Sequence, residues 1–178
     1  MKKWAYILSG IALAVTVVGC QSKEKDASDR IMENRERFIQ LLLSTGRPGM
    51  ESVISHLDST DFFTKSGGGH HTEPGGLVQH SIEVYKLMKG LAWFQDSGSI
   101  AIVALFHDMG KIDEGGWHTW RSVKHLSEWG LELTDEEYLA IFRHHNLEFK
   151  YYRHALCRAL IVADAISSAW WKLRHRKK

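Results

Sequence analysis

An apolar run at residues 100–106 ends directly in the pair His107–Asp108. The run reads Ile-Ala-Ile-Val-Ala-Leu-Phe, which predicts a buried segment. A carboxylate at the end of a buried segment is costly unless it is compensated or neutralised by a shift of its pKa. A divalent cation removes that cost, and histidine and aspartate are both common metal ligands. The pair therefore predicts a fold that gathers further ligands around a buried metal site.

The chain has 178 residues, a length typical of one compact domain with a short extension. Its formal charge of +2 gives little support to a nucleic-acid-binding module. The two cysteines, Cys20 and Cys157, lie far apart and indicate no disulfide framework. Eleven histidines are many for this length, and the middle of the chain holds His70, His71, His80, His107, His118, His144 and His145.

The first 20 residues have the pattern of a secretory signal. Lys2 and Lys3 form a basic start, residues 4–18 are nearly all apolar, and the run ends at Gly19-Cys20. The apolar stretch is shorter than the roughly 20 residues that a transmembrane helix needs. The pattern resembles the lipobox of bacterial lipoproteins, in which the cysteine becomes the first residue and carries diacylglycerol. The alternative is a short, uncleaved membrane anchor.

These features predict three regions: a signal peptide at 1–19, a polar tether at 20–29 and a helical domain at 30–178. In both interpretations of the signal, the domain faces outward and is attached to the membrane, through lipidated Cys20 if the signal is cleaved. If the signal interpretation is wrong, the protein is expected in the cytoplasm.

Hydrophobic periodicity and capping signals predict a single all-α domain of about six or seven helices. Ser28 or Asp29 can cap the first helix, and Pro48 suits the first turn of the second. Thr134 and Glu137 form a capping-box pattern. No alternation of polar and apolar residues indicates a sheet. The expected helices cover roughly residues 30–43, 48–57, 77–93, 99–107, 119–129, 134–142 and 154–173, with Gly-rich loops at 66–76 and 110–117.

The candidate metal ligands are spread over several of these segments, as expected when a helical domain directs side chains into one core site. They are His80 in the third predicted helix, His107–Asp108 at the end of the fourth, His118 after the Gly-rich loop, His144–His145 at the end of the next helix, and Asp164 inside an apolar stripe of the last. Taken singly, His80 is better explained as a buried residue of an amphipathic helix, and the alternative for Asp164 is a structural partner of Arg153 or Arg158.

Two sequence segments carry the most specific pattern. Gly75-Gly76-Leu-Val-Gln-His80-Ser is similar to the segment GGLLEHS, and Ala104-Leu-Phe-His-Asp-Met-Gly-Lys111 to ALLHDxGK. Both belong to the HD-domain superfamily of metal-dependent phosphohydrolases, whose pattern is a histidine, a His-Asp pair and a distant aspartate. Asp61-Phe62-Phe63-Thr64 and the additional histidines resemble small HD hydrolases of bacteria and phages. The resemblance covers roughly residues 48–170.

The resemblance implies a metal site held by His80, His107, Asp108 and Asp164. Such ligands suit Mn, Fe, Co, Ni, Zn or Mg better than a soft metal. In subfamilies with added histidines, a second ion lies beside the first and the aspartate of the pair bridges both. His118 and His144 are the expected ligands of that second ion. His145 is the alternative to His144, because consecutive helical residues point about 100° apart.

The resemblance also implies hydrolysis of a phosphate ester, with a phosphorylated small molecule such as a nucleotide as substrate. Metal coordination makes hydroxide available near neutral pH, and Asp108 is expected to lie beside the attacking oxygen. Lys111 is expected to neutralise a substrate phosphate or to be a surface lysine. His70 and His71 are expected to contact substrate or to be solvated loop residues. The alternative function is a lipid-anchored binding or exclusion protein that keeps the metal fold without turnover.

Overall fold

A computed structural model describes residues 26–146 and 153–176. Within these residues the regular structure is entirely helical, which confirms the all-α prediction. The first helix covers residues 26–43. It is followed by α2 (Met50–Asp58), α3 (Gly76–Leu91), α4 (Ser97–Phe106), the short 3-10 helix η1 (Met109–Ile112), α5 (His118–Glu128), α6 (Asp135–Arg143) and α7 (Ala155–Arg174).

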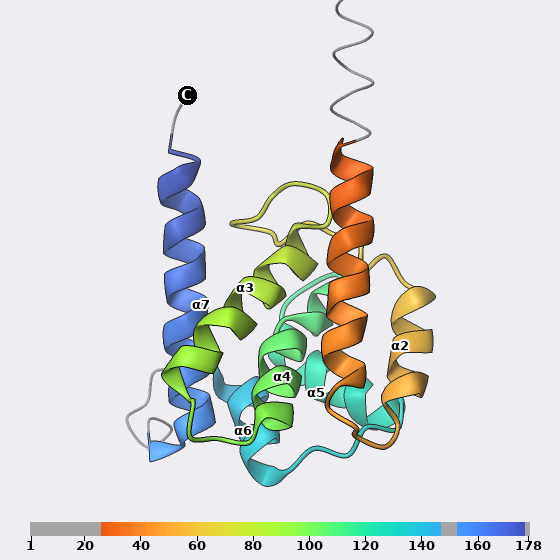
Figure 1. The fold of residues 1–178 in the computed structure, drawn as a ribbon, viewed down its shortest axis with the longest axis vertical. Helices are drawn as coiled ribbons and strands as arrows, with labels where there is room; N and C mark the ends of the chain where they lie inside the picture. The colour runs from red at the N-terminus through yellow and green to blue at the C-terminus, as the bar shows by residue number, and fades with distance from the viewer. Residues whose placement is uncertain (1–25, 147–152, 177–178) are drawn as a thin grey trace, which may run out of the picture.

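Helix α4 forms the centre of the domain. All of its residues from Ile100 to Phe106 are buried, as is typical of a helix enclosed by others. Helices α3, α6 and α7 pack against it. Figure 1 shows α4 between α7 and the first helix, whose Phe38 meets the ring of Phe106 edge-on at 6.1 Å. The residues that follow Phe106 therefore emerge inside the core.

Two local signals fix where the helices around this core begin. The Asp96 side chain accepts a hydrogen bond from the Ser99 backbone N–H at 2.8 Å and so starts α4. Thr134 and Glu137 form the predicted capping box at the start of α6. The two helices end at Phe106 and Arg143, so that His107 and His144 are their C-cap residues.

Two predicted helix starts are wrong. Ser28 and Asp29 lie inside the first helix, which is already helical at residue 26, because no glycine or proline interrupts this segment. Pro48 lies before α2, whose N-cap is Gly49 with a φ of 84°. A Cβ at Gly49 would lie 2.0 Å from the carbonyl oxygen of Gly130, so only glycine allows this close contact with the loop after α5. The helix begins directly after this contact.

The predicted signal peptide at 1–19 and residues 20–25 of the predicted tether lie outside the described residues. The remaining tether residues, 26–29, belong to the first helix. Among the helices that the structure describes, none combines the length and the hydropathy needed to cross a bilayer.

Candidate metal centre

The predicted ligands converge from five parts of the chain. His80 comes from α3, His107–Asp108 from the end of α4, and Asp164 from α7. His118 begins α5, and His144–His145 follow α6. Their ligand atoms form two groups, each with all atoms within 4.8 Å of one another: His80, His107 and Asp164 in the first, and Asp108, His118, His144 and His145 in the second.

The first group is built around the Nε2 atom of His80. This atom lies 3.1 Å from Oδ1 of Asp164 and 3.3 Å from Nε2 of His107. One oxygen of Asp108, Oδ2, completes the group at 3.4 Å from His107 Nε2 and 3.7 Å from His80 Nε2. Two imidazoles and two carboxylates therefore surround one point in the core, and these are ligand types that bind divalent transition metals.

The second group is built around the other oxygen of Asp108. Oδ1 lies 3.2 Å from Nε2 of His118 and 3.7 Å from Nε2 of His144. His145 joins through its Nε2 atom, which lies 3.0 Å from that of His118. Each oxygen of Asp108 therefore faces a different set of imidazoles, the arrangement expected of a carboxylate shared by two ions.

His144 and His145 both reach this group, although only one was expected to. The expectation assumed a continuing helix, but α6 ends at Arg143 and the two histidines lie in the turn that follows. The 100° separation between neighbouring side chains therefore does not apply to them. His144 is almost fully buried, whereas His145 is exposed.

Helix ends fix the orientation of two of the buried histidines. His107 and His144 are the C-cap residues of α4 and α6. Their Nδ1–H groups donate to the carbonyl oxygens of Ala104 at 2.9 Å and Ile141 at 2.7 Å. A carbonyl can only accept, so the proton stays on Nδ1 and the lone pair of Nε2 points toward Asp108.

The centre contains two buried polar atoms without a hydrogen-bond partner in the described part of the chain. They are Oδ1 of Asp108 and Nε2 of His144. Leaving such atoms unpaired costs about 1–3 kcal/mol each in a folded protein. Both atoms are metal ligands by chemistry and both point into the second group, so the residues present fit a divalent metal ion.

Except at His107, the electrostatics favour the protonation states that a cation requires, which are ionised carboxylates and neutral imidazoles. Burial disfavours the Asp108 carboxylate, but its attraction to His107 outweighs this and holds its pKa well below the usual range. Burial likewise opposes ionisation of Asp164, and the hydrogen bond with His80 reverses the effect and lowers its pKa. Burial lowers the pKa of His80 and His144, whereas Asp108 overcomes burial and raises that of His107.

A glycine allows α5 to approach the His-Asp pair. Gly110 lies in η1, which packs against α5. A Cβ at Gly110 would lie 2.2 Å from the carbonyl oxygen of His118. The Ser122 hydroxyl links the two segments, accepting from the Gly110 N–H at 2.8 Å and donating to the His107 carbonyl at 3.1 Å. This close contact holds His118 within reach of Asp108.

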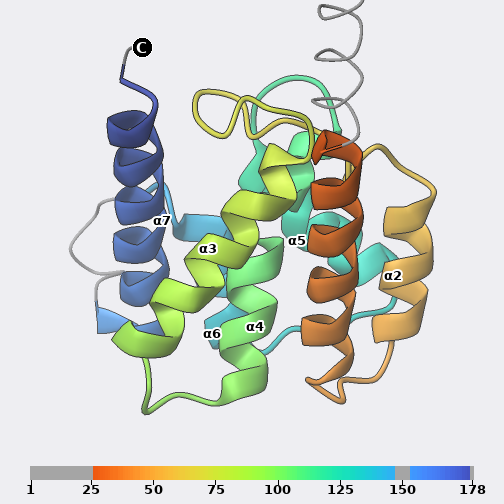
Figure 2. The same cartoon turned by 45° about the horizontal axis from the view of Figure 1, so that its top comes forward.

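Lys111 is not a free surface lysine. Its ammonium group lies 2.6 Å from Oδ2 of Asp108 and 3.4 Å from the carbonyl oxygen of Gly67. The side chain is one-quarter exposed, at 25%. Lys111 therefore bridges the metal centre and the Gly-rich segment 66–75, which Figure 2 shows curving over the N-terminal end of α3.

The two loop histidines in this segment differ. His71 is fully buried, with a left-handed φ of 50°, so it is not a solvated loop residue. His70 is half-buried, and its ring centroid lies 4.6 Å from that of His80. The sequence reasoning missed three further residues: Glu83 contacts His71, Ser168 contacts His70, and Ser167 contacts His80. Glu83 follows His80 at helical spacing, but the residues around it form no motif that would indicate a functional role.

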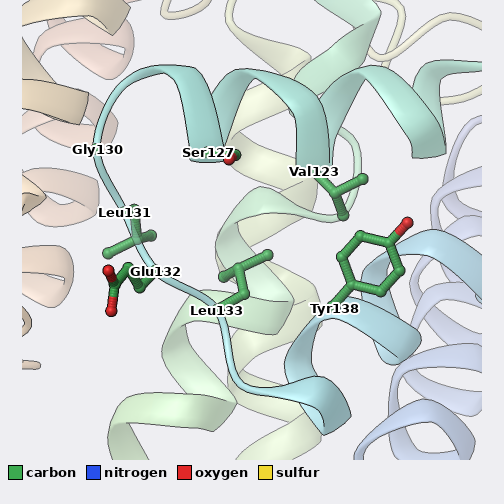
Figure 3. A pocket seen from close by; sticks show the side chains of 7 residues that line it. All are labelled: Val123, Ser127, Gly130, Leu131, Glu132, Leu133 and Tyr138. Atoms are coloured by element: carbon green, nitrogen blue, oxygen red, sulfur yellow. The ribbon is translucent and has the colours of Figure 1, made fainter.

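A separate pocket of about 520 Å³ lies between α5, the loop after it and α6. Figure 3 shows Val123 and Tyr138 at one end of this pocket and Leu131 and Glu132 at the other. No candidate metal ligand lines it. The pocket is therefore distinct from the metal centre.

Comparison with known proteins agrees with this geometry. The HD domain family model matches residues 77–169, which include His80, the His107–Asp108 pair and Asp164. The chain belongs to the HD domain family. HD domains bind divalent metals and are generally metal-dependent hydrolases. No curated protein and no solved structure gives a significant match.

Proposed function

We propose that this HD domain hydrolyses a phosphate ester of a small molecule such as a nucleotide. The observation that carries the proposal is the position of Asp108, whose two buried oxygens face two separate groups of imidazoles. A divalent ion bound there supplies Lewis acidity and lowers the pKa of water toward neutrality. His80, His107 and Asp164 would hold one ion, His118, His144 and His145 would hold a second, and Asp108 would contribute to both.

Two residues beside the centre are suited to hold the substrate. Lys111 places its ammonium group next to Asp108, where it attracts phosphoryl oxygens and offsets their charge. His70 offers a half-buried imidazole on the segment that covers the centre, and its Nε2 atom reaches substrate by exchanging its contact with the Ser168 hydroxyl. His71 is fully buried, so we assign it to holding His70 in place rather than to touching substrate.

The direct test combines metal analysis with a substrate panel. Purified protein is reconstituted with Mn²⁺ and assayed on phosphomonoesters, phosphodiesters and nucleotides. Release of phosphate or of a nucleoside monophosphate, dependent on metal, supports the proposal. Metal binding without turnover of any ester favours the alternative of a binding or exclusion protein, and absence of bound metal overturns both.

Replacing His118 separates one ion from two. His118→Ala is expected to lower the metal content from about two ions per chain toward one and to remove most of the activity, because His118 contacts only the second group. Elemental analysis and initial rates measure both effects. His125→Ala is the matched control, since His125 lies on the same helix and contacts Asp113 at 2.7 Å, outside the centre. An unchanged metal content in His118→Ala would remove this residue from the ligand set.

We further propose that the domain is attached to the outer side of a bacterial membrane through Cys20. The support is the sequence pattern of residues 1–20 alone. Cys20→Ser is expected to abolish incorporation of radiolabelled palmitate and to leave a longer, unprocessed precursor. Absence of label in the wild-type protein, together with a cytosolic location, would contradict this proposal and return the enzyme to the cytoplasm.

A further inference from the structure

We propose that Glu83 is a positioning residue, which fixes the metal-binding orientation of His80 through Ser167 and holds the segment that carries His70 and His71. Glu83 lies outside both ligand groups. The inference rests on the metal centre proposed above, but it does not depend on which ester is hydrolysed.

A chain of hydrogen bonds runs from Glu83 to His80. The Ser167 hydroxyl donates to Oε2 of Glu83 at 3.1 Å. The same hydroxyl oxygen lies 3.1 Å from Nδ1 of His80. His80 is fully buried and Ser167 nearly so, so no bulk water replaces these contacts. The three residues come from α3 and α7, and this contact also helps to hold the two helices together.

The direction of these bonds determines which nitrogen of His80 binds metal. A hydroxyl has one proton, and in Ser167 that proton is used toward the Glu83 carboxylate, which can only accept. The Ser167 oxygen therefore accepts from Nδ1–H of His80, and the lone pair is left on Nε2, the atom that faces Asp164. Without Glu83, the hydroxyl is free to donate to Nδ1 instead, which favours the opposite tautomer.

His80 differs in this respect from His107 and His144. Those two donate to carbonyl groups of their own helices, so their orientation needs no other side chain. The orientation of His80 depends on two other side chains, Glu83 on its own helix and Ser167, which lies 87 positions away in the sequence. A single substitution outside the centre can therefore change the orientation of His80.

The same carboxylate orders the loop histidines. Nε2–H of His71 donates to Oε2 of Glu83, at a distance of 3.1 Å. The other ring nitrogen of His71, Nδ1, lies 3.0 Å from Nδ1 of His70. The Nε2 atom of His70 in turn lies 2.9 Å from the Ser168 hydroxyl oxygen. Removing Glu83 removes the contact that holds His71, so it affects the segment as well as His80.

The charge state of Glu83 supports this role. Burial opposes ionisation, but hydrogen bonds from His71 and Gln79 outweigh it and lower the pKa of Glu83 to about 2. Its second oxygen is contacted by Gln79 Nε2 at 3.3 Å and Arg174 at 3.4 Å. The side chain is therefore an ionised acceptor at neutral pH, with its Oε2 atom directed at Ser167 and His71.

The test measures metal affinity in the full chain. Mn²⁺ and Zn²⁺ are titrated calorimetrically into metal-free wild type and the variants Glu83→Ala, Glu83→Gln and Ser167→Ala. Glu83→Ala and Ser167→Ala are expected to weaken binding by about ten- to a hundredfold. Glu83→Gln is expected to recover part of the loss, because its amide oxygen still accepts from Ser167. Ser81→Ala is the matched control, since Ser81 is equally buried on α3 but bonds only to the Leu77 carbonyl.

A second measurement separates positioning from general destabilisation. Hydrogen–deuterium exchange of residues 66–75 in the metal-free protein is expected to rise in Glu83→Ala and to stay unchanged in Ser167→Ala. Affinities of Glu83→Ala and Ser167→Ala within twofold of wild type would overturn the inference, as would an equal loss in Ser81→Ala. A wild type that binds no metal overturns it together with the proposed function. Metal binding without hydrolysis overturns only the proposed function, and the variant affinities still decide the role of Glu83.

Discussion

Asp108→Asn is expected to lose bound metal and hydrolytic activity together. Asparagine keeps the size of the side chain but removes the negative charge and replaces one ligand oxygen with an amide nitrogen, which cannot bind metal. Since both ligand groups use Asp108, both ions are affected. The expected fall in activity is at least about a thousandfold, or ~4 kcal/mol in transition-state stabilisation. Elemental analysis and initial rates on the best ester measure it.

The control for Asp108→Asn is Asp113→Asn. Asp113 lies a few residues further along the chain, is exposed, and pairs with His125 rather than with the centre. It should keep wild-type metal content and rate. Circular dichroism should show unchanged helical content in both variants, because Asp108 serves the ion more than the apolar core. Retained activity in Asp108→Asn would contradict the assignment of the centre.

Glu137→Ala is expected to give the largest loss of stability. Glu137 is fully buried, and its two carboxylate oxygens accept from the Arg47 guanidinium at 3.0 and 2.8 Å. It also forms the capping box with Thr134. Removing it leaves a partly buried arginine without its carboxylate and the Thr134 backbone N–H without its acceptor. The loss should lower the free energy of unfolding by about 3–5 kcal/mol. Urea unfolding of the metal-free protein measures the change.

A surface glutamate provides the comparison for Glu137→Ala. Glu128 is exposed and pairs with Lys124 at 3.3 Å on α5. Its replacement by alanine should change the free energy of unfolding by less than about 0.5 kcal/mol. A similar, small effect in Glu137→Ala would mean that the buried ion pair contributes no more than a surface pair.

Local sequence signals predicted much of the fold and of the ligand set. The all-α class followed from periodicity and capping, and the capping box of Thr134 and Glu137 forms as expected. The structure brings His80, His107, Asp108 and Asp164 together, as their resemblance to HD domains implied. The fold prediction succeeded because it depends on residues that are close in sequence, and the grouping of these four residues followed from short, specific patterns. Their role as metal ligands stays a prediction.

Interactions between distant segments were not predictable in this way. The contact between Glu83 and Ser167 joins residues 84 positions apart, and neither residue lies in a recognisable motif. The joint approach of His144 and His145 depends on where α6 stops, and helix ends are the least certain part of a sequence-based assignment. The burial of His71 depends on a left-handed backbone conformation in a Gly-rich segment.

The ends of three helices also give the centre an uneven distribution of charge. Helices α4 and α6 end at His107 and His144, so their C-terminal ends, each with roughly half a negative charge from aligned peptide dipoles, point toward the ligands. Helix α5 begins at His118, which is partly exposed, and so presents the opposite, positive end near the rim. The interior thus attracts cations while its entrance attracts phosphate. A metal-free centre with two carboxylates repels an anion from its interior, so under the proposed function metal is expected to bind before substrate.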